Sequence, residues 1–592
     1  MKIPVSWDYE TVCNLLAEIR SRNRLLVTAC RIVERISQTS RHCRHLRWFI
    51  VLSLAVVTLA LSGCSKRDEA ERPREPPLQV MRQPAVRGTY RRPLANDPAS
   101  IDPAKLVDLY GAAVATQIFD GLIGFDGHLN VIPKLAQSWS ASRDGLLWTF
   151  HLRQGVQFHN GREMSAEDVV YSLSRLLDPT VGSHRSNVLD KVMGAAEFQA
   201  GTTKSVEGID AMDRYTVQIS LSDPFPPFIS SLGMADTSIV PREEVQRRDA
   251  SFATAPVGTG PFRFVRWERG REIVLEANEH YFRGRPALDR VRFVIFPGMT
   301  DAESDMLRAF EQGELEESPI TPDRQKELLE AGRYPVIQKP TLSLRLLGFN
   351  LERPPFTQRE VRQAFNYAID RIRVNQEVPR GRYVVARSIL PPGMPGYNPE
   401  VQGYSYDPDK AKQLLAQAGY PGGKNFVPVT LSSSRKSRDE PQLVQQALAA
   451  IGIQLEFQQF DDWTSYQPAL QRGDVQLFTF TWYADYPDPD NFLYPLFHSQ
   501  SHTNYFRYRN PTVDKLLDDA RRETDDLRRV DLYRRAEQII LSDAPVVTLL
   551  HYTYERVFQP YVEGIEVSAL GEPYISLSKV RLRQTGETST RK

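Results

Sequence analysis

Cysteine is nearly absent from this sequence of 592 residues, and its distribution is uneven. The four cysteines are Cys13, Cys30, Cys43 and Cys64, so none occurs in the long remainder of the chain. That remainder can form no internal disulfide and no cysteine-ligated metal site, and it provides no cysteine nucleophile. It also presents no thiol to an oxidising compartment, which is consistent with export.

The sequence also lacks a charge excess and the common catalytic signatures. Lys and Arg number 74 and Asp and Glu 73, and the net charge of +1 gives no indication of a nucleic-acid partner. No G-x-S-x-G, H-E-x-x-H, G-x-x-x-x-G-K-S/T or G-x-G-x-x-G pattern occurs. We therefore expect neither enzymatic activity nor a cofactor. The composition, 41% hydrophobic and 25% charged, is typical of a globular protein, and the length suffices for two or three domains.

Long apolar runs are missing, with one exception. Residues 48–61 (WFIVLSLAVVTLAL) are apolar and follow the basic stretch 41–47. The run is too short for a spanning helix, which needs about 20 residues, but it fits a signal-peptide core. The sequence LSGC, ending at Cys64, resembles a bacterial lipobox, in which cleavage precedes the cysteine and its thiol carries a diacylglyceryl group.

We therefore predict a signal segment over residues 1–63 and lipidation of Cys64. An uncleaved anchor with an incidental cysteine is the alternative. Residues 64–92, rich in Pro, Arg and Glu, predict a flexible tether to the membrane. Such a protein would reside in the periplasm or at the cell surface.

The rest of the chain mixes strand and helix patterns and predicts an α/β fold. β-branched and aromatic residues indicate strands over 147–153, 215–221, 272–277, 291–296, 453–457 and 475–480. Helix-start signals occur at Ser165, which begins a capping-box pattern, at Asp407-Pro408 and at Asn510-Pro511. A further apolar stripe predicts a core-facing helix, with Val361, Ala364, Phe365, Ala368 and Ile372 on one side.

Five segments, in order along the chain, resemble the family-5 extracellular solute-binding proteins, which are the periplasmic oligopeptide- and dipeptide-binding proteins of ABC transporters. They are 146–161 (LLWTFHLRQGVQFHNG), 165–172 (SAEDVVYS), 256–262 (PVGTGPF), 361–371 (VRQAFNYAIDR) and 482–489 (WYADYPDP). We interpret most of them as scaffold. Gly258 and Gly260 in particular predict tight turns that glycine adopts at little cost.

The resemblance implies a two-lobed periplasmic binding protein of the Venus-flytrap, cluster C type, with the ligand between the lobes. It places a first lobe at 93–318, with an extra subdomain at about 129–254, and a second lobe at 319–552. Residues 553–592 would return to the first lobe and end in a flexible tail. Closure of two lobes on a ligand is a hinge motion that the ligand biases by touching both sides.

The resemblance also implies the site residues. In the family, the acid of the segment matching Trp482-Tyr483-Ala484-Asp485-Tyr486 binds the amino terminus of a peptide, so Asp485 is the predicted counter-charge. Trp482, Tyr483 and Tyr486 would line side-chain pockets, and Tyr110 and Gly111 would contribute from the first lobe. The competing interpretation of Asp485 is a turn cap, which we also assign to Asp488 and Asp490. The partner of the peptide carboxylate stays open among Arg345, Arg382, Arg387 and the basic stretch 435–438, which is more typical of a solvated loop.

The expected partners are a short peptide, the permease subunits of an ABC transporter and, through the lipid anchor, the membrane. We expect a monomer and no nucleic acid. Three alternatives remain: another organic solute such as an opine, a sugar or a cell-wall peptide; a nickel complex, for which His498 and His502 have helix-compatible spacing; and a sensory lipoprotein without transport. No metal ligand is assigned.

Overall fold

The computed structural model describes residues 88–296, 302–434 and 437–583. The apolar run, Cys64 and most of the predicted tether lie outside the described residues, and the described residues all belong to one compact unit. Strand β1 begins at Thr89, inside the predicted 64–92 tether; it pairs with residues 290–295, and its Tyr90 side chain is fully buried. No helix within the described ranges combines the length and apolar character needed to cross a membrane.

Two four-stranded sheets organise the N-terminal part, and we call them the N-terminal sheets. In the order β1-β10-β9-β8, β1 pairs in parallel with β10 and the other pairs are antiparallel; the order β4-β5-β7-β6 is antiparallel throughout. One continuous apolar core joins them. Their strands are β1 (Thr89–Leu94), β4 (Ala136–Ala141), β5 (Leu147–Leu152), β6 (Ile209–Asp213), β7 (Thr216–Ser220), β8 (Phe262–Glu268), β9 (Glu272–Ala277) and β10 (Arg290–Ile295); β2 (Ile123–Phe125) and β3 (Val131–Pro133) form a separate antiparallel pair.

Six helices accompany these sheets: α4 (Leu109–Ile118), α5 (Ala166–Leu177), α6 (Ala195–Gln199), α7 (Phe228–Ser231), α8 (Arg242–Arg248) and α9 (Ala302–Glu311). The start of α5 forms as its sequence predicts, since the Asp168 carboxylate accepts the Ser165 amide at 2.9 Å. The two glycines at 258 and 260 have a different role from the one predicted. Neither has a positive φ, and a Cβ on either would lie within 2.6 Å of the Ile118 backbone. Close packing against the end of α4, rather than a special turn, requires glycine there.

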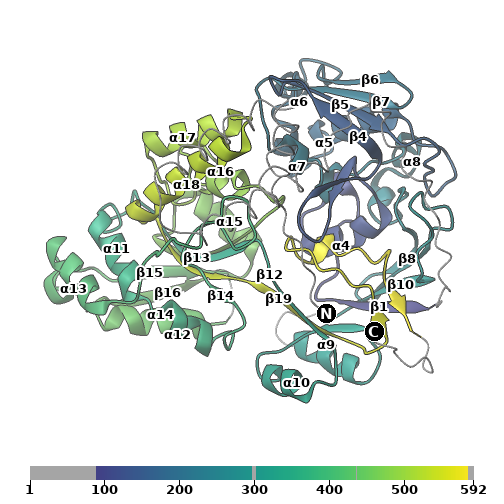
Figure 1. Ribbon diagram of the computed structural model, residues 1–592. Coiled ribbons are helices and arrows are strands. Elements are labelled where there is room, and N and C mark those ends of the chain that lie inside the picture. The colour runs from purple at the N-terminus through teal and green to yellow at the C-terminus, as the bar shows by residue number, and fades with distance from the viewer. Residues whose placement is uncertain (1–87, 297–301, 435–436, 584–592) are drawn as a thin grey trace, which may run out of the picture. The chain divides into compact units, whose positions relative to one another are not determined.

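A six-stranded mixed sheet, in the order β14-β18-β13-β17-β15-β16, organises the C-terminal part. Alternate residues of β13 face opposite sides, so that Leu344 and Leu346 enter one core while Leu347 and Phe349 enter another. Helices α15 to α18 cover the first side and α11 to α14 the second (Figure 1). The strands are β13 (Ser343–Phe349), β14 (Val384–Val385), β15 (Val429–Ser433), β16 (Leu455–Gln459), β17 (Leu477–Tyr483) and β18 (Val546–His551).

The helices of this part are α11 (Arg359–Ala368), α12 (Arg371–Glu377), α13 (Pro408–Gln417), α14 (Asp439–Ala449), α15 (Trp463–Arg472), α16 (Asp490–Phe497), α17 (Pro511–Arg522) and α18 (Asp526–Asp543). Asp407 and Asn510 cap α13 and α17 as predicted. The predicted position of Ile372 in a core-facing stripe is wrong. The first helix ends at Ala368 and Asp370 caps a new one, which leaves the Ile372 side chain 56% exposed.

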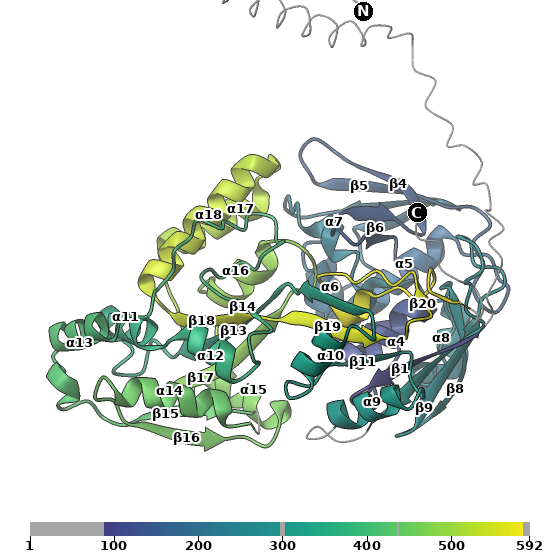
Figure 2. The same cartoon turned by 60° about the horizontal axis from the view of Figure 1, so that its bottom comes forward.

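A small sheet, β11-β19-β12, carries the chain between the two parts. It consists of β11 (Glu317–Pro319), β12 (Val336–Pro340) and β19 (Thr553–Phe558), with α10 (Gln325–Ala331) between the first two. Strands β12 and β19 pair antiparallel, and each adjoins a strand of the six-stranded sheet in sequence, β13 and β18 (Figures 1 and 2). The chain ends with the short pair β20 (Val562–Glu563) and β21 (Arg581–Leu582).

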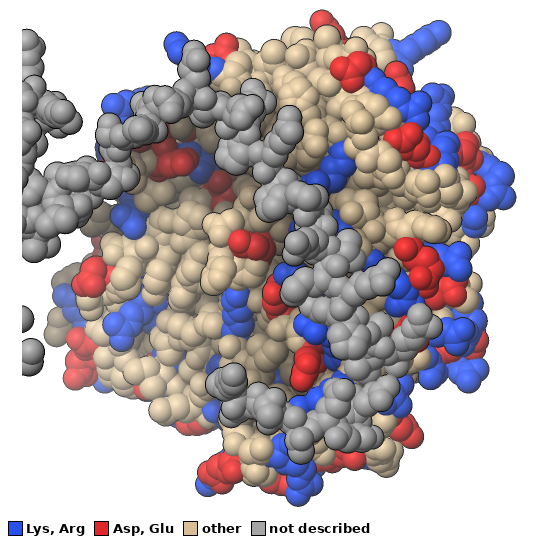
Figure 3. All heavy atoms as spheres, turned by 45° about the vertical axis from the view of Figure 1, so that its right-hand side comes forward, with Lys and Arg blue, Asp and Glu red and all other residues tan. Residues whose placement is uncertain are grey.

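Acidic and basic side chains are interspersed over the face shown in Figure 3. Ion pairs that are partly or fully exposed are common in the structure, for example the pair between Arg285 and Glu279. Exposed pairs of this kind contribute little to stability, typically 0–1 kcal/mol each. The mixture of both signs agrees with the nearly neutral net charge of the sequence.

Candidate functional site

Asp485 lies where two distant segments of the chain meet. It follows β17, the strand that carries Trp482 and Tyr483, and precedes α16. Its carboxylate forms a two-pronged ion pair with Arg185, in which Nη2 lies 2.9 Å from Oδ1 and Nη1 lies 3.0 Å from Oδ2. Arg185 directly precedes a 3-10 turn, Ser186–Leu189, in the segment between α5 and α6. The ion pair therefore joins the six-stranded sheet to the N-terminal sheets.

Tyr574 makes a second contact with Asp485 from the end of the chain. Its hydroxyl donates to the Asp485 carbonyl oxygen at 3.0 Å. Tyr574 belongs to a 3-10 turn, Glu572–Tyr574, that packs against α4, where the Thr116 hydroxyl donates to the Pro573 carbonyl at 2.7 Å. Asp485 is thus held by its own strand, by the Arg185 segment and by the C-terminal turn.

Asp236 adds a second negative charge to this cluster. It lies in the turn Ala235–Thr237, and its carboxylate is coupled electrostatically to both Arg185 and Asp485. Burial raises the pKa of Asp236 to about 6; Arg185 opposes this rise and Asp485 adds to it. The attraction of Asp485 raises the pKa of Arg185, and burial raises that of the Tyr574 hydroxyl. With both carboxylates ionised, the cluster of Arg185, Asp236 and Asp485 has a net charge of −1.

The aromatic residues predicted around Asp485 lie in different environments. The Trp482 indole donates to the Asn491 carbonyl at 2.7 Å, which holds the ring against the first turn of α16. Tyr483 is 42% exposed and its ring lies 5.9 Å from that of Tyr552. Tyr486, by contrast, is buried in the core of the N-terminal sheets, where burial raises its pKa well above the usual value.

The two later acids of this loop are parts of a buried network. Asp488 accepts the Asp490 amide at 2.9 Å, which is the turn role predicted for it, and it also pairs with Arg529 at 2.5 Å. Asp490 is 1% exposed and pairs with Arg521 at 3.1 Å, so it anchors α16 instead of forming a turn. Burial raises the pKa of Asp490.

Tyr110 and Gly111 lie in the first turn of α4. The Tyr110 hydroxyl accepts a hydrogen bond from Asn96 at 3.3 Å, and the Gly111 amide donates to the Asp108 carboxylate at 2.7 Å, which caps the helix. A Cβ at position 111 would meet the Ser100 carbonyl oxygen at 2.3 Å. The glycine therefore allows α4 to pack closely. The structure connects α4 to Asp485 through the C-terminal turn.

Of the arginines predicted as partners for a ligand carboxylate, two bind other groups of the protein and one is exposed. Arg345 is 3% exposed and bound to Glu440 with Nε–Oε distances of 3.1 Å. Arg382 donates to the Ile320 carbonyl at 2.6 Å and lies 3.5 Å from Glu555. Arg387 is exposed, and residues 435–436 of the basic stretch lie outside the described residues.

The two histidines with metal-compatible spacing do not come together. His498 is buried and stacks on Tyr494 at 4.3 Å, with its Nε2 3.4 Å from Asp518, whereas His502 is exposed. Among the described residues, no group of three or more His, Cys, Asp or Glu side chains could hold a metal ion.

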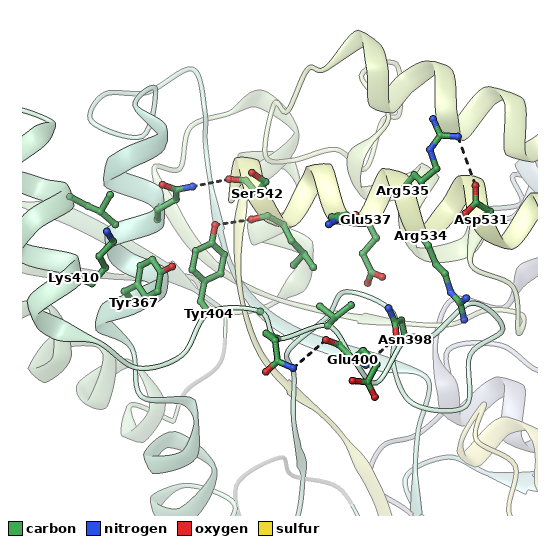
Figure 4. A pocket seen from close by; sticks show the side chains of 17 residues that line it. Tyr367, Asn398, Glu400, Tyr404, Lys410, Asp531, Arg534, Arg535, Glu537 and Ser542 are labelled. Atoms are coloured by element: carbon green, nitrogen blue, oxygen red, sulfur yellow. Dashed lines mark hydrogen bonds and ion pairs between the residues drawn. The ribbon is translucent and has the colours of Figure 1, made fainter.

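A cavity of about 690 Å³ lies elsewhere in the C-terminal part, between α18 and the 398–404 loop. Glu537 and Arg534 point from α18 towards the loop that carries Asn398 and Glu400 (Figure 4). The Glu537 carboxylate is 1% exposed and accepts the amides of Ile389 and Leu390, each at 2.8 Å. Burial raises the pKa of Glu537 to about 7. None of the predicted site residues lines this cavity.

Sequence reasoning missed three residues that interact with Asp485: Arg185, Asp236 and Tyr574. They precede Asp485 by 300 and 249 positions, or follow it by 89, and each sits in a short 3-10 turn or beside one. No local pattern marks them. Only the side-chain positions in the structure show that these three residues meet at Asp485.

Comparisons with known proteins match this architecture. The family model of bacterial extracellular solute-binding proteins, family 5, matches residues 130–504. Heme-binding protein A of Haemophilus influenzae is 32% identical over 88% of this chain and 97% of its own length, and the dipeptide-binding protein of Escherichia coli is 30% identical over 78% and 88%.

A solved structure shares the fold. The periplasmic binding protein DppA of Helicobacter pylori, in complex with the peptide STSA, superposes with a TM-score of 0.72 at 29% identity, over 84% of this chain and 99% of that one. The predicted two-lobed α/β fold is confirmed, while the lobe boundaries at 318 and 552 stay predictions. The match over most of the chain and the shared fold together show that this chain belongs to family 5 of the bacterial extracellular solute-binding proteins.

Proposed function

We propose that the chain is the solute-binding component of an ABC importer and that it captures short peptides without chemical turnover. Family membership supports a role in solute capture, and one relative is named for dipeptides while a structural neighbour holds STSA. The observation that carries the proposal is Asp485. Its carboxylate stands at the junction between the six-stranded sheet and the N-terminal sheets, 21% exposed.

In this proposal Asp485 binds the peptide ammonium. An ammonium group enclosed away from water requires an opposite charge and hydrogen bonds, because desolvating it alone costs several kcal/mol. The peptide backbone would add main-chain hydrogen bonds, while water in roomy pockets accommodates variable side chains. Trp482 and Tyr483, at the end of β17, offer the aromatic walls for such pockets. The lobes, 93–318 and 319–552, would close around the ligand, and the permease subunits would recognise the closed form.

Calorimetry on an Asp485→Asn variant tests the ligand assignment. We expect its affinity for a dipeptide such as Ala-Phe to fall about a hundredfold, close to 3 kcal/mol, because the ammonium loses its charged partner. Asp409→Asn is the matched control, since that carboxylate is 85% exposed and lies in α13. Unchanged affinity in the Asp485 variant would remove this residue from the site. Mass spectrometry of solutes that co-purify with the wild type identifies the natural ligand.

We further propose that Cys64 carries the lipid that anchors the protein, as a monomer, to the membrane facing the periplasm or the cell surface. The apolar run and the LSGC sequence support this assignment. Growth with a labelled fatty acid is the test. We expect label in the wild type and none in a Cys64→Ala variant, and equal labelling of both would refute the assignment.

A further inference from the structure

The carboxylate that we assign to the ligand ammonium is already occupied by a cation of the same chain. Both oxygens of Asp485 receive one nitrogen each of the Arg185 guanidinium, at 2.9 and 3.0 Å. A two-pronged contact of this kind is the strongest geometry available to an arginine and a carboxylate. An ammonium that binds Asp485 must therefore share or replace the Arg185 contact.

Arg185 is suited to leave, unlike other arginines paired with acids nearby. Its side chain is 40% exposed, and within the described part of the chain its guanidinium hydrogen-bonds only to Asp485. The side chains of Arg529 and Asp488 are 8% and 9% exposed, and those of Arg345 and Glu440 are 4% and 11% exposed. Breaking a buried pair leaves a charge without a partner and costs several kcal/mol, whereas a partly exposed pair is worth about 1 kcal/mol or less.

A second carboxylate is available to a displaced Arg185. Asp236 interacts electrostatically with Arg185 and with Asp485, and its carboxylate accepts no side-chain hydrogen bond from the described residues. The three residues together hold one positive and two negative charges. One additional ligand cation balances the cluster, with the ammonium on Asp485 and the guanidinium on Asp236.

We infer that the Arg185 side chain occupies the ligand site exchangeably. It pairs with Asp485 when no ligand is bound, and it shifts towards Asp236 when a ligand ammonium binds Asp485. Asp236 is then a positioning residue that does not touch the ligand but receives the displaced guanidinium. This inference rests on the proposed role of Asp485. Arg185 then lowers the apparent affinity for the ligand, because the ligand ammonium must compete with a cation that is tethered to the same chain.

The pH dependence follows from the charges that face Asp236, which are Arg185 and Asp485, together with the Tyr574 hydroxyl. Asp236 receives the guanidinium only when it is ionised. Since its pKa is raised to about 6, we expect ligand affinity to increase between pH 5 and pH 7.5. An Asp236→Asn variant should show no such increase.

A double-mutant cycle, measured by calorimetry with Ala-Phe, tests the inference. We expect Arg185→Gln to bind the peptide roughly three- to tenfold more tightly than the wild type, because the competitor is gone. Asp236→Asn should bind it weaker by a similar factor. In the double variant the Asp236 substitution should have no effect, since no guanidinium remains to be received. Arg214→Gln, which removes an arginine 59% exposed and paired with Glu163, is the control expected to match the wild type.

The outcomes separate this inference from the proposed function. Two results would overturn the exchange while leaving peptide binding at Asp485 intact. One is weaker peptide binding by Arg185→Gln, and the other is a loss of affinity from Asp236→Asn that is the same with and without Arg185. If instead the wild type binds neither Ala-Phe nor STSA, or binds N-acetylated Ala-Phe as tightly as Ala-Phe, the proposed ammonium site itself fails and the exchange fails with it.

Discussion

Glu537 has a buried carboxyl group, and its protonation affects the stability of the C-terminal part. Its carboxylate is 1% exposed and accepts two backbone amides, and burial raises its pKa from 4.5 to about 7. Between these two values the folded protein holds a proton that the unfolded chain has released. The contribution of Glu537 to stability is therefore fully present below about pH 4.5 and is lost as the pH rises through 7.

The size of the effect follows from the rise in pKa. Each pH unit of the rise corresponds to about 1.4 kcal/mol, so ionising Glu537 in place costs up to about 3 kcal/mol at pH 8.5. A Glu537→Gln variant retains the oxygen that accepts the Ile389 and Leu390 amides and cannot ionise. We expect it to exceed the wild type by less than about 1 kcal/mol at pH 5 and by about 2–3 kcal/mol at pH 8.5.

Thermal denaturation of both proteins across this pH range is the assay. The informative quantity is the change with pH in the difference between their melting temperatures, since a chain with several cores need not unfold in two states. Glu400→Gln is the control, because Glu400 lines the same cavity but is exposed. A difference between Glu537→Gln and the wild type that is the same at pH 5 and pH 8.5 would show that the carboxyl is not buried as described.

Two further substitutions test the packing of the backbone and the buried charges. Gly260→Ala should destabilise the protein by about 1–3 kcal/mol, because its Cβ would approach the Ile118 carbonyl carbon to 2.5 Å; denaturant unfolding measures the loss. Glu317→Ala should cost about 3–5 kcal/mol in the same measurement, because it removes the nearer of two carboxylates that pair with the fully buried Arg92, at 3.0 Å, and leaves only Glu572 at 3.4 Å.

Each of these substitutions has a control in the same chain. A Cβ at Gly127 meets nothing within 4 Å, so Gly127→Ala should leave stability within about 0.5 kcal/mol of the wild type. Glu279 is 61% exposed in its pair with Arg285, and Glu279→Ala should cost less than about 1 kcal/mol. Equal effects within either pair would contradict the packing or the burial on which the prediction depends.

Hydrophobic periodicity and helix-end signals predicted helices and strands well where residues adjacent in the sequence determine the local structure. Strand β9 occupies Glu272–Ala277 as predicted, and β16 and β17 begin two residues later than predicted. The failure at Ile372 has a local cause that competes with periodicity. Asp370 accepts the amides of Ile372 and Arg373 and so starts a new helix, which rotates the apolar stripe away from the core.

The site could be predicted only in part. Asp485 was found because it follows a strand in a segment that resembles a known family, and its assignment as a ligand residue stays a prediction. Arg185 and Asp236 could not be found in this way, since a pair of opposite charges that meets across 300 positions leaves no periodic trace. The tertiary structure alone brings them together, and the same holds for Tyr574.

The short C-terminal turn Glu572–Tyr574 connects the site to the strands that cross between the two parts of the chain. At one end of the turn, Glu572 pairs with Arg556 of β19 at 2.6 Å, and Arg556 lies 3.8 Å from the buried Glu317 of β11. At its other end, two residues later, the Tyr574 hydroxyl donates to the Asp485 carbonyl. The middle residue of the turn, Pro573, also accepts the Thr116 hydroxyl of α4. A rotation about the crossing strands must therefore either carry this turn along or break one of these contacts. The charges at the crossing are buried and expensive to separate, whereas the single neutral hydrogen bond to Asp485 is worth about 1 kcal/mol. The contact at Asp485 is thus the one expected to yield when the two parts move, which places the mobile end of the turn at the residue assigned to the ligand.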